Sequence, residues 1–191
     1  MPLVRLVAWL LSKALEKQRL RPSSAFPGII IAERKTHEGI LVRSTAALWA
    51  ELVYRLGKDW SVALQLSPWE WEEMVAGAFK KDGFDEVTLT PRSRDYGRDV
   101  IAIKHRVGCV KIIGSVKAYK PGNLVRHDDV RALLGVLSGE RDASKGIITT
   151  TSDFAPGIAS DPGIAPFLPT RLELMNGEQL RKWLTKLAGT S

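Results

Sequence analysis

Three residues of types that recur in metal-assisted phosphodiester chemistry follow one another along this chain, each on its own predicted element. Glu72 lies in a predicted helix, Asp99 opens an apolar strand, and Lys117 lies within a later strand. Carboxylate oxygens are the ligands that Mg²⁺ prefers. A lysine beside the metal stabilises charge on a phosphate or steadies the attacking water. The combination therefore indicates a hydrolytic site for a phosphodiester.

Each of these residues also has a purely structural explanation. At ~100° per residue, Glu72 falls beside Val75 and Phe79 at the edge of an apolar stripe, but acids near a helix N-terminus are also favoured by the helix dipole. Asp99 alone is explained better as a turn residue, and Lys117 alone could extend into solvent from an edge strand. Only their convergence on adjacent elements favours a shared site.

The elements that must position these residues predict a mixed α/β domain over residues 65–191. Its first helix starts at Ser67, which forms a capping-box pattern with Pro68 and Glu70. Three strands follow as a meander: Glu86–Thr90, Asp99–Ile103 and Cys109–Tyr119. The remaining elements are a helix over Asp128–Ser138, a strand over Gly146–Thr151, a strand over Arg171–Met175 and a helix over Gly177–Leu187. The connection from the third strand through the helix over Asp128–Ser138 is long enough for a right-handed parallel crossover, which predicts a mixed sheet flanked by helices.

Residues 1–64 are predicted to form a small N-terminal α+β extension. A Pro/Ser/Gly-rich break at 21–28 follows an amphipathic helix, and a short hairpin (Gly28–Ala32 with Ile40–Val42) and a helix from Ser44 or Thr45 to about Leu56 come next. The polar face of the first helix mixes Glu with Lys and Arg. That mixture favours packing on the domain or on a second subunit over a membrane-surface anchor.

Composition bounds the class of protein. The 191 residues include 28 Lys and Arg against 21 Asp and Glu, a formal net charge of +7, and the sequence pI is about 9.7. A basic chain of this kind is consistent with a polyanion partner. The hydrophobic fraction of 45% excludes general disorder.

Several classes of site and location are disfavoured by the sequence. The single cysteine, Cys109, excludes an intrachain disulfide and fits a reducing, cytoplasmic location. The three histidines follow no zinc-ligand spacing. No stretch approaches the roughly 20 apolar residues of a membrane span, and the apolar run after Met1 lacks a cleavage site, so neither a membrane protein nor a signal peptide is expected.

The chain resembles the catalytic domain of Mrr-type restriction endonucleases, within the PD-(D/E)xK nuclease superfamily, from Ser67 to about Leu184. The pieces that carry this resemblance are short, but they occur in the family's order and spacing. They are Trp71–Val75, Gly83–Phe84, Asp95–Asp99, Val116–Lys120, Asp129–Leu137, Lys145–Thr151 with Phe154, and Asn176–Leu180.

The resemblance implies a restriction-endonuclease-like fold and a role for each site residue. Asp99 would ligate Mg²⁺ (or Mn²⁺ in its place), Glu72 would complete the metal site directly or through water, and the carbonyl of Val116 would be a further ligand. Lys117 would be the catalytic lysine. At Ser115 the family usually has Glu or Gln, and a serine places no carboxylate on the metal. Ser115 is therefore expected to hydrogen-bond a water at the site, and metal binding without DNA is expected to be weak.

Basic residues surround these positions and are expected to contact the phosphates of double-stranded DNA. This set, together with one aromatic residue, comprises Arg92, Arg94, Arg98, Tyr119, Lys120 and Arg126. A homodimer is expected because two-fold symmetry suits cleavage of both strands. No small-molecule cofactor is expected.

The sequence therefore predicts a Mg²⁺-dependent DNA endonuclease in restriction or defence against foreign DNA. Because Ser115 departs from the family pattern, a catalytically impaired nuclease-fold protein that only binds DNA is the main alternative. A structure-specific nuclease, resolvase or RNase, and an adaptor acting through residues 1–64, are also open.

Overall fold

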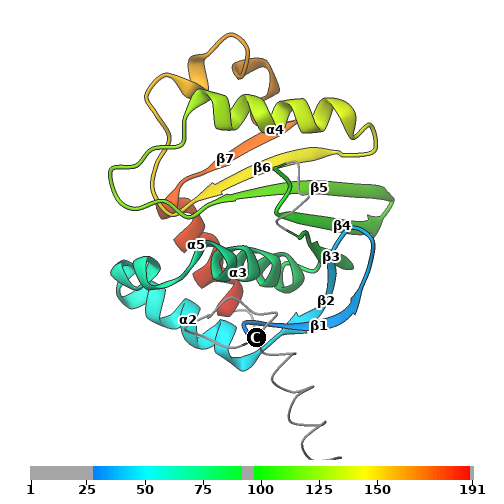
Figure 1. Cartoon of the computed structure of the whole chain (residues 1–191), viewed down its shortest axis with the longest axis vertical. Coiled ribbons are helices and arrows are strands. Elements are labelled where there is room, and N and C mark those ends of the chain that lie inside the picture. Colours follow the sequence, from blue (N-terminus) through cyan, green and yellow to red (C-terminus); the bar gives the residue numbers. More distant parts are fainter. Residues whose placement is uncertain (1–27, 92–96, 190–191) are drawn as a thin grey trace, which may run out of the picture.

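The computed structural model describes residues 28–91 and 97–189, which form a seven-stranded sheet with helices on both faces (Figure 1). The strand order is the chain order. The strands are β1 (Ile30–Lys35), β2 (Ile40–Thr45), β3 (Glu86–Leu89), β4 (Val100–Arg106), β5 (Gly108–Lys117), β6 (Lys145–Thr150) and β7 (Leu172–Met175). The predicted N-terminal helix and the predicted contacts of Arg92 and Arg94 lie outside the described residues.

The predicted mixed sheet is confirmed. Strands β1 to β5 pair antiparallel in succession, and β6 and β7 run parallel to β5. The parallel step is made by α4 (His127–Gly139), which leads from β5 to β6 as a crossover helix. The meander therefore ends where the crossover begins, at Lys117.

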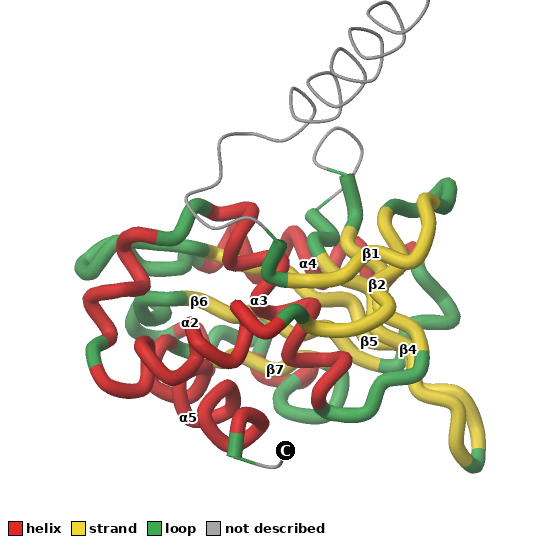
Figure 2. The backbone as a smooth tube through the Cα atoms, turned by 90° about the horizontal axis from the view of Figure 1, so that it is seen from below, coloured by secondary structure: helices red, strands yellow, loops and turns green. Residues whose placement is uncertain are grey.

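The two faces of the sheet are covered by different helices (Figures 1 and 2). On one face, Val130, Leu133 and Leu137 of α4 pack with Ile113 of β5 and Ile148 of β6. On the other face lie α2 (Ala47–Lys58), α3 (Pro68–Lys81) and α5 (Gly177–Ala188). Short 3-10 turns at Trp60–Gln65, Ile158–Ser160 and Ala165–Phe167 complete the described elements.

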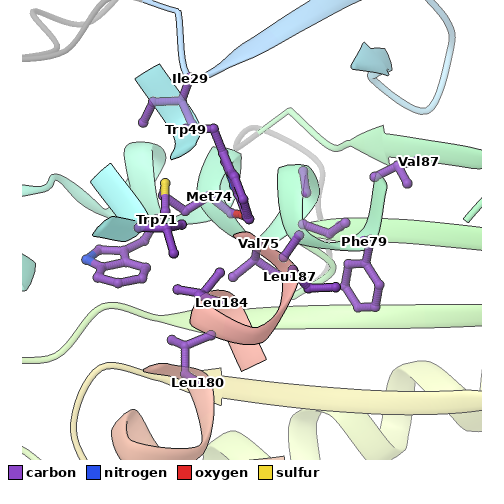
Figure 3. Packing of buried hydrophobic residues seen from close by; sticks show 14 of the residues in the cluster. Ile29, Trp49, Trp71, Met74, Val75, Phe79, Val87, Leu180, Leu184 and Leu187 are labelled. Atoms are coloured by element: carbon purple, nitrogen blue, oxygen red, sulfur yellow. The ribbon is translucent and has the colours of Figure 1, made fainter. Parts of the chain in front are cut away.

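The larger core lies between the three helices and their face of the sheet, and tryptophans from two of the helices contribute to it (Figure 3). Trp49 and Trp71 are fully buried. The indole N–H of Trp49 donates to the carbonyl of Met74 at 2.9 Å, and that of Trp71 donates to the carbonyl of Ala63 at 3.1 Å. These bonds satisfy the only polar group of each ring, so the rings contribute their large apolar area without an unpaired donor.

Two predicted helix starts have different outcomes. The capping box of α3 is confirmed, because Ser67 Oγ accepts from the N–H of Glu70 at 3.3 Å and Glu70 Oε2 accepts from the N–H of Ser67 at 2.7 Å. The prediction that Ser44 or Thr45 caps α2 is wrong, since pairing with β1 keeps both residues in β2. The N-cap is Ala46, whose side chain has no hydrogen-bonding group.

The described part of the predicted N-terminal extension shares the sheet and the core of the rest of the chain. Its hairpin joins through β2, where Ile40 pairs with Leu89 and Leu41 with Thr88. At the hairpin turn, a Cβ on Gly39 would lie 2.1 Å from the carbonyl oxygen of Leu89, so only glycine allows this close approach. The division of the chain at residue 64 stays a prediction.

Among the helices of residues 28–91 and 97–189, none combines the length and the apolar character that crossing a bilayer requires.

Candidate active site at the carboxyl end of β5

Asp99 lies immediately before β4, with its carboxylate against the neighbouring strand. Its N–H donates to the carbonyl of Gly114 at 2.9 Å, and its Oδ2 accepts from the N–H of Val116 at 2.6 Å. The carboxylate thus accepts the hydrogen bond of an amide that would pair with the backbone of β4 if that strand began earlier. Because the N–H and C=O of a strand residue point to the same side, the Val116 carbonyl is directed to the same edge.

Ser115 and Lys117 point to the α4 face of the sheet. They alternate with Ile112 and Val116, which pack on the side of α3, and follow Ile113, which packs on the side of α4. Ser115 is 4% exposed, whereas the side chain of Lys117 is 27% exposed. The serine is therefore enclosed, and the lysine reaches the surface of the site.

Lys117 forms an ion pair that was not predicted for it. Its Nζ lies 3.3 Å from Oδ1 of Asp129, in the first turn of α4, and Oδ2 of Asp129 accepts from the N–H of Arg126 at 3.0 Å. A lysine in so apolar a strand indicates that an anionic partner is near. The sequence gives that signal, but it does not identify the partner, because Asp129 becomes a neighbour only through the crossover.

Glu72 approaches from the other side of the sheet. It lies in α3 and is 7% exposed, whereas Glu70 in the same turn serves the capping box. A carboxylate this buried needs a polar or cationic partner. The predicted role of Glu72 in a metal site stays a prediction.

An open cavity of about 540 Å³ adjoins the Lys117–Asp129 pair. It is lined by Tyr119, Gly122, Asn123, Leu124, Arg126, Asp129 and Ala155. Two of the predicted DNA contacts, Tyr119 and Arg126, therefore meet at one place beside the lysine. Lys120 is exposed on the same connection.

Arg98, the fourth predicted DNA contact within the described residues, belongs to a separate cluster of charges. Its guanidinium pairs with Glu140, which also binds Lys111 at 3.0 Å, and Lys111 binds Asp142 at 2.9 Å. Burial lowers the pKa of the Lys111 amine, but its hydrogen bonds to Asp142 and Glu140 outweigh burial and hold that pKa above its ordinary value. The cluster joins the segment before β4 to the end of α4, so it supports the position of Asp99.

The donor set at the site fits a small hard cation. No group of three or more His, Cys, Asp or Glu side chains that could bind a metal occurs in the part of the chain that the structure describes. Mg²⁺, however, is bound through one or two carboxylates together with waters and substrate phosphates. The Asp99 carboxylate and the Val116 carbonyl at one edge are oxygen donors of that kind.

The region that contains the candidate site matches a protein-family model. The family model described as a restriction endonuclease, Mrr catalytic domain, matches residues 63–184. A comparison with curated proteins found no match.

Two solved structures resemble this chain, each at 17% identity. One is the MspJI restriction endonuclease in complex with a 27-mer oligonucleotide, with a TM-score of 0.49, and the aligned part covers 77% of this chain and 33% of that one. The other is the DNA modification-dependent restriction endonuclease AspBHI, with a TM-score of 0.47 and coverages of 90% and 46%. This chain thus corresponds to less than half the length of either structure.

Proposed function

Because the chain belongs to the restriction endonuclease family, with a catalytic domain of the Mrr type, we propose that it is a Mg²⁺-dependent DNA endonuclease. The observation that carries the proposal is the placement of Asp99 and Lys117 at the carboxyl end of β5. There a carboxylate is bound to the Val116 amide, and the next residue is a lysine whose ion-pair partner, Asp129, lines an open cavity. Mn²⁺ would replace Mg²⁺, since both prefer oxygen ligands.

Each residue of the site has a role that follows from its position. Asp99 and the Val116 carbonyl would hold the metal, with Glu72 completing its surroundings directly or through water. The metal, when bound, supplies Lewis-acid polarisation of the scissile phosphate. Lys117 would orient the attacking water and stabilise the charge that develops on the phosphate. Ser115 is enclosed beside the lysine and would donate a hydrogen bond to a water.

DNA would reach the site across its basic rim. Arg126 and Tyr119 line the cavity beside Lys117, and Lys120 is exposed next to them. Contacts of Arg and Lys with phosphate position a duplex without reading its sequence. We propose double-stranded DNA as the substrate, a homodimer as the form that cuts both strands, and restriction of foreign DNA in the cytoplasm as the role.

A DNA-binding protein with impaired catalysis is a second candidate, and one observation favours it. Ser115 stands where the family places Glu or Gln, so β5 itself supplies no carboxylate two residues before Lys117. Fewer carboxylates weaken a Mg²⁺ site.

Plasmid cleavage with Mg²⁺ or Mn²⁺, against EDTA, separates the two candidates. We expect metal-dependent nicking by the wild type, at least about a hundredfold less by Asp99→Ala and Lys117→Ala, and unchanged nicking by the matched control Lys104→Ala in β4. A faster Ser115→Gln variant would identify position 115 as the weak point of the metal site. Tight, salt-sensitive DNA binding by a wild type that cleaves neither modified nor unmodified DNA would instead establish the second candidate.

A further inference from the structure

We propose that Asp129 supplies a further carboxylate to the metal site, on the α4 face of the sheet, where Ser115 provides none. The inference rests on the proposed nuclease function and adds one residue to the same site. It begins from the ion pair between Asp129 and Lys117, which places a carboxylate oxygen 3.3 Å from the catalytic lysine.

The carboxylate comes from the side of the sheet to which position 115 points. Ser115 and Lys117 both face α4, and Asp129 belongs to the first turn of that helix. A Glu at position 115 would extend from the strand towards α4, whereas Asp129 extends from α4 towards the strand. Asp129 on α4 thus places a negative charge on the same face of the sheet as a Glu at position 115 of β5 would.

Asp129 is also accessible to solvent, whereas Ser115 is buried. Its side chain is 24% exposed and lines the cavity of about 540 Å³, which is open to solvent beside Arg126. A Mg²⁺ ion keeps several waters and shares its site with substrate phosphate, so it needs such a space. The guanidinium of Arg126 at the same cavity suits a phosphate that arrives with the ion.

The carboxylate is oriented before any ligand arrives. Its Oδ2 accepts from the N–H of Arg126 at 3.0 Å, which leaves Oδ1 directed at Lys117. A carboxylate has about four lone-pair positions, so both contacts together leave capacity for a cation. The neighbouring Asp128 is different, since its side chain is 93% exposed and pairs with Arg131 at 3.2 Å.

Asp128 therefore provides a matched control for the test. Mn²⁺ binding to the full chain, without DNA, is measured by the loss of the free-ion electron paramagnetic resonance signal for the wild type, Asp129→Asn and Asp128→Asn. Asparagine keeps an oxygen for the Arg126 amide, so Asp129→Asn retains the cap of α4. We expect a Mn²⁺ affinity at least about fivefold lower for Asp129→Asn and an unchanged affinity for Asp128→Asn.

A second variant tests whether a carboxylate at position 115 of β5 can replace that of Asp129. Ser115→Glu in the Asp129→Asn background is expected to restore Mn²⁺ binding, and cleavage with it. Folding of each variant is checked by its thermal midpoint, and Glu72→Gln is measured alongside to compare the acid on the other face.

The outcomes separate this proposal from the nuclease function. If Asp129→Asn binds Mn²⁺ as the wild type does but cleaves less, Asp129 only orients Lys117 and the proposal is overturned while the nuclease stands. If the wild type cleaves nothing, yet its Mn²⁺ affinity falls in Asp129→Asn and not in Asp128→Asn, the carboxylate is a ligand and the nuclease function fails. Absence of measurable Mn²⁺ binding by the wild type at millimolar concentrations would also overturn the proposal.

Discussion

The carboxylate of Asp99 and the amide of Val116 meet at 2.6 Å, so the residue proposed to hold the metal also closes the gap where β4 has not yet begun. One side chain thus serves both the sheet and the site. The two roles are separable because the hydrogen bond needs only an oxygen acceptor, whereas a Mg²⁺ site is weakened when a carboxylate is replaced by a neutral amide.

The first prediction separates these roles at position 99. Asp99→Asn keeps an acceptor for the Val116 amide, so the free energy of unfolding changes little while cleavage falls by about a hundredfold or more. Asp99→Ala removes the acceptor and is expected to lose about 1–3 kcal/mol of stability as well. Urea unfolding and plasmid nicking of both variants check this. Equal destabilisation by the two substitutions would contradict it.

The second prediction concerns the ion-pair cluster around the buried Lys111. Lys111→Met removes the amine that binds Glu140 and Asp142, and we expect a loss of about 1.5–3 kcal/mol in the free energy of unfolding, since each bond involves charged groups. The exposed Lys182, paired with Glu178 on α5, is the matched control, and Lys182→Met should change stability by less than about 1 kcal/mol.

The contribution of Lys111 also has a defined pH dependence. Its pKa is higher in the folded chain, so the folded state holds the proton more tightly than the unfolded state. This stabilisation is complete below the ordinary lysine pKa of about 10.4 and is lost as the pH rises through the higher folded value. The stability difference between wild type and Lys111→Met is therefore expected to be constant up to about pH 10 and to shrink between about pH 10 and pH 12 in urea titrations. A difference that stays constant from about pH 10 to pH 12 would refute this account.

A third prediction tests the contact between α2 and α3. A Cβ at Gly77 would lie 2.6 Å from the ring of Trp49, so Gly77→Ala forces the buried indole to move and is expected to lose about 1–3 kcal/mol of stability. In α4, Gly135 has nothing within 4 Å of an added Cβ. Gly135→Ala is therefore expected to raise stability by up to about 1 kcal/mol through helix propensity. Thermal midpoints of the two variants should move in opposite directions.

A fourth prediction concerns the route of DNA. Arg126 lines the cavity beside Lys117, and if it contacts one phosphate, Arg126→Ala should make the slope of log affinity against log salt shallower by about 0.9. Arg106 lies at the opposite end of β5, where β4 turns into it, and Arg106→Ala should leave the slope unchanged. Binding of an uncleaved duplex in EDTA at several salt concentrations measures both. Identical slopes for the two variants would remove Arg126 from the DNA path.

Local patterns in the sequence predicted most of the elements. The meander, the crossover helix and the capping box at Ser67 each depend on residues close together in the chain, and each is confirmed. The cap of α2 was assigned to Ser44 or Thr45 because both are good capping residues, but pairing with β1 holds them in the sheet. The strand pairing of Ser44 and Thr45 with β1 therefore outweighs their capping propensity, and a local sequence pattern does not show that pairing.

The alternation of side chains along β5 could be predicted from the sequence, but the ion-pair partners of the charged residues could not. Alternation along β5 places Ser115 and Lys117 on one face, and the structure has them there. Asp129, the partner of Lys117, lies in α4, and Glu140, the partner of Arg98, is the C-cap residue that follows it. Packing of Val130, Leu133 and Leu137 decides which turn of this crossover helix lies over which strand. The sequence specifies those apolar residues without fixing their register against the sheet.

Because the strands stand in the sheet in the order in which they occur in the chain, each new strand finds its neighbour already synthesised. During synthesis only the connecting segment has to close, which keeps the entropic barrier to each pairing small. The core on the α3 face is completed later, because it includes α5, the last described helix. Trp183 of α5 packs edge-on against Phe79 of α3, with 5.2 Å between the ring centroids. Asp99, Lys117 and Asp129 are thus all present in the growing chain some fifty residues before the helix that seals its core is made.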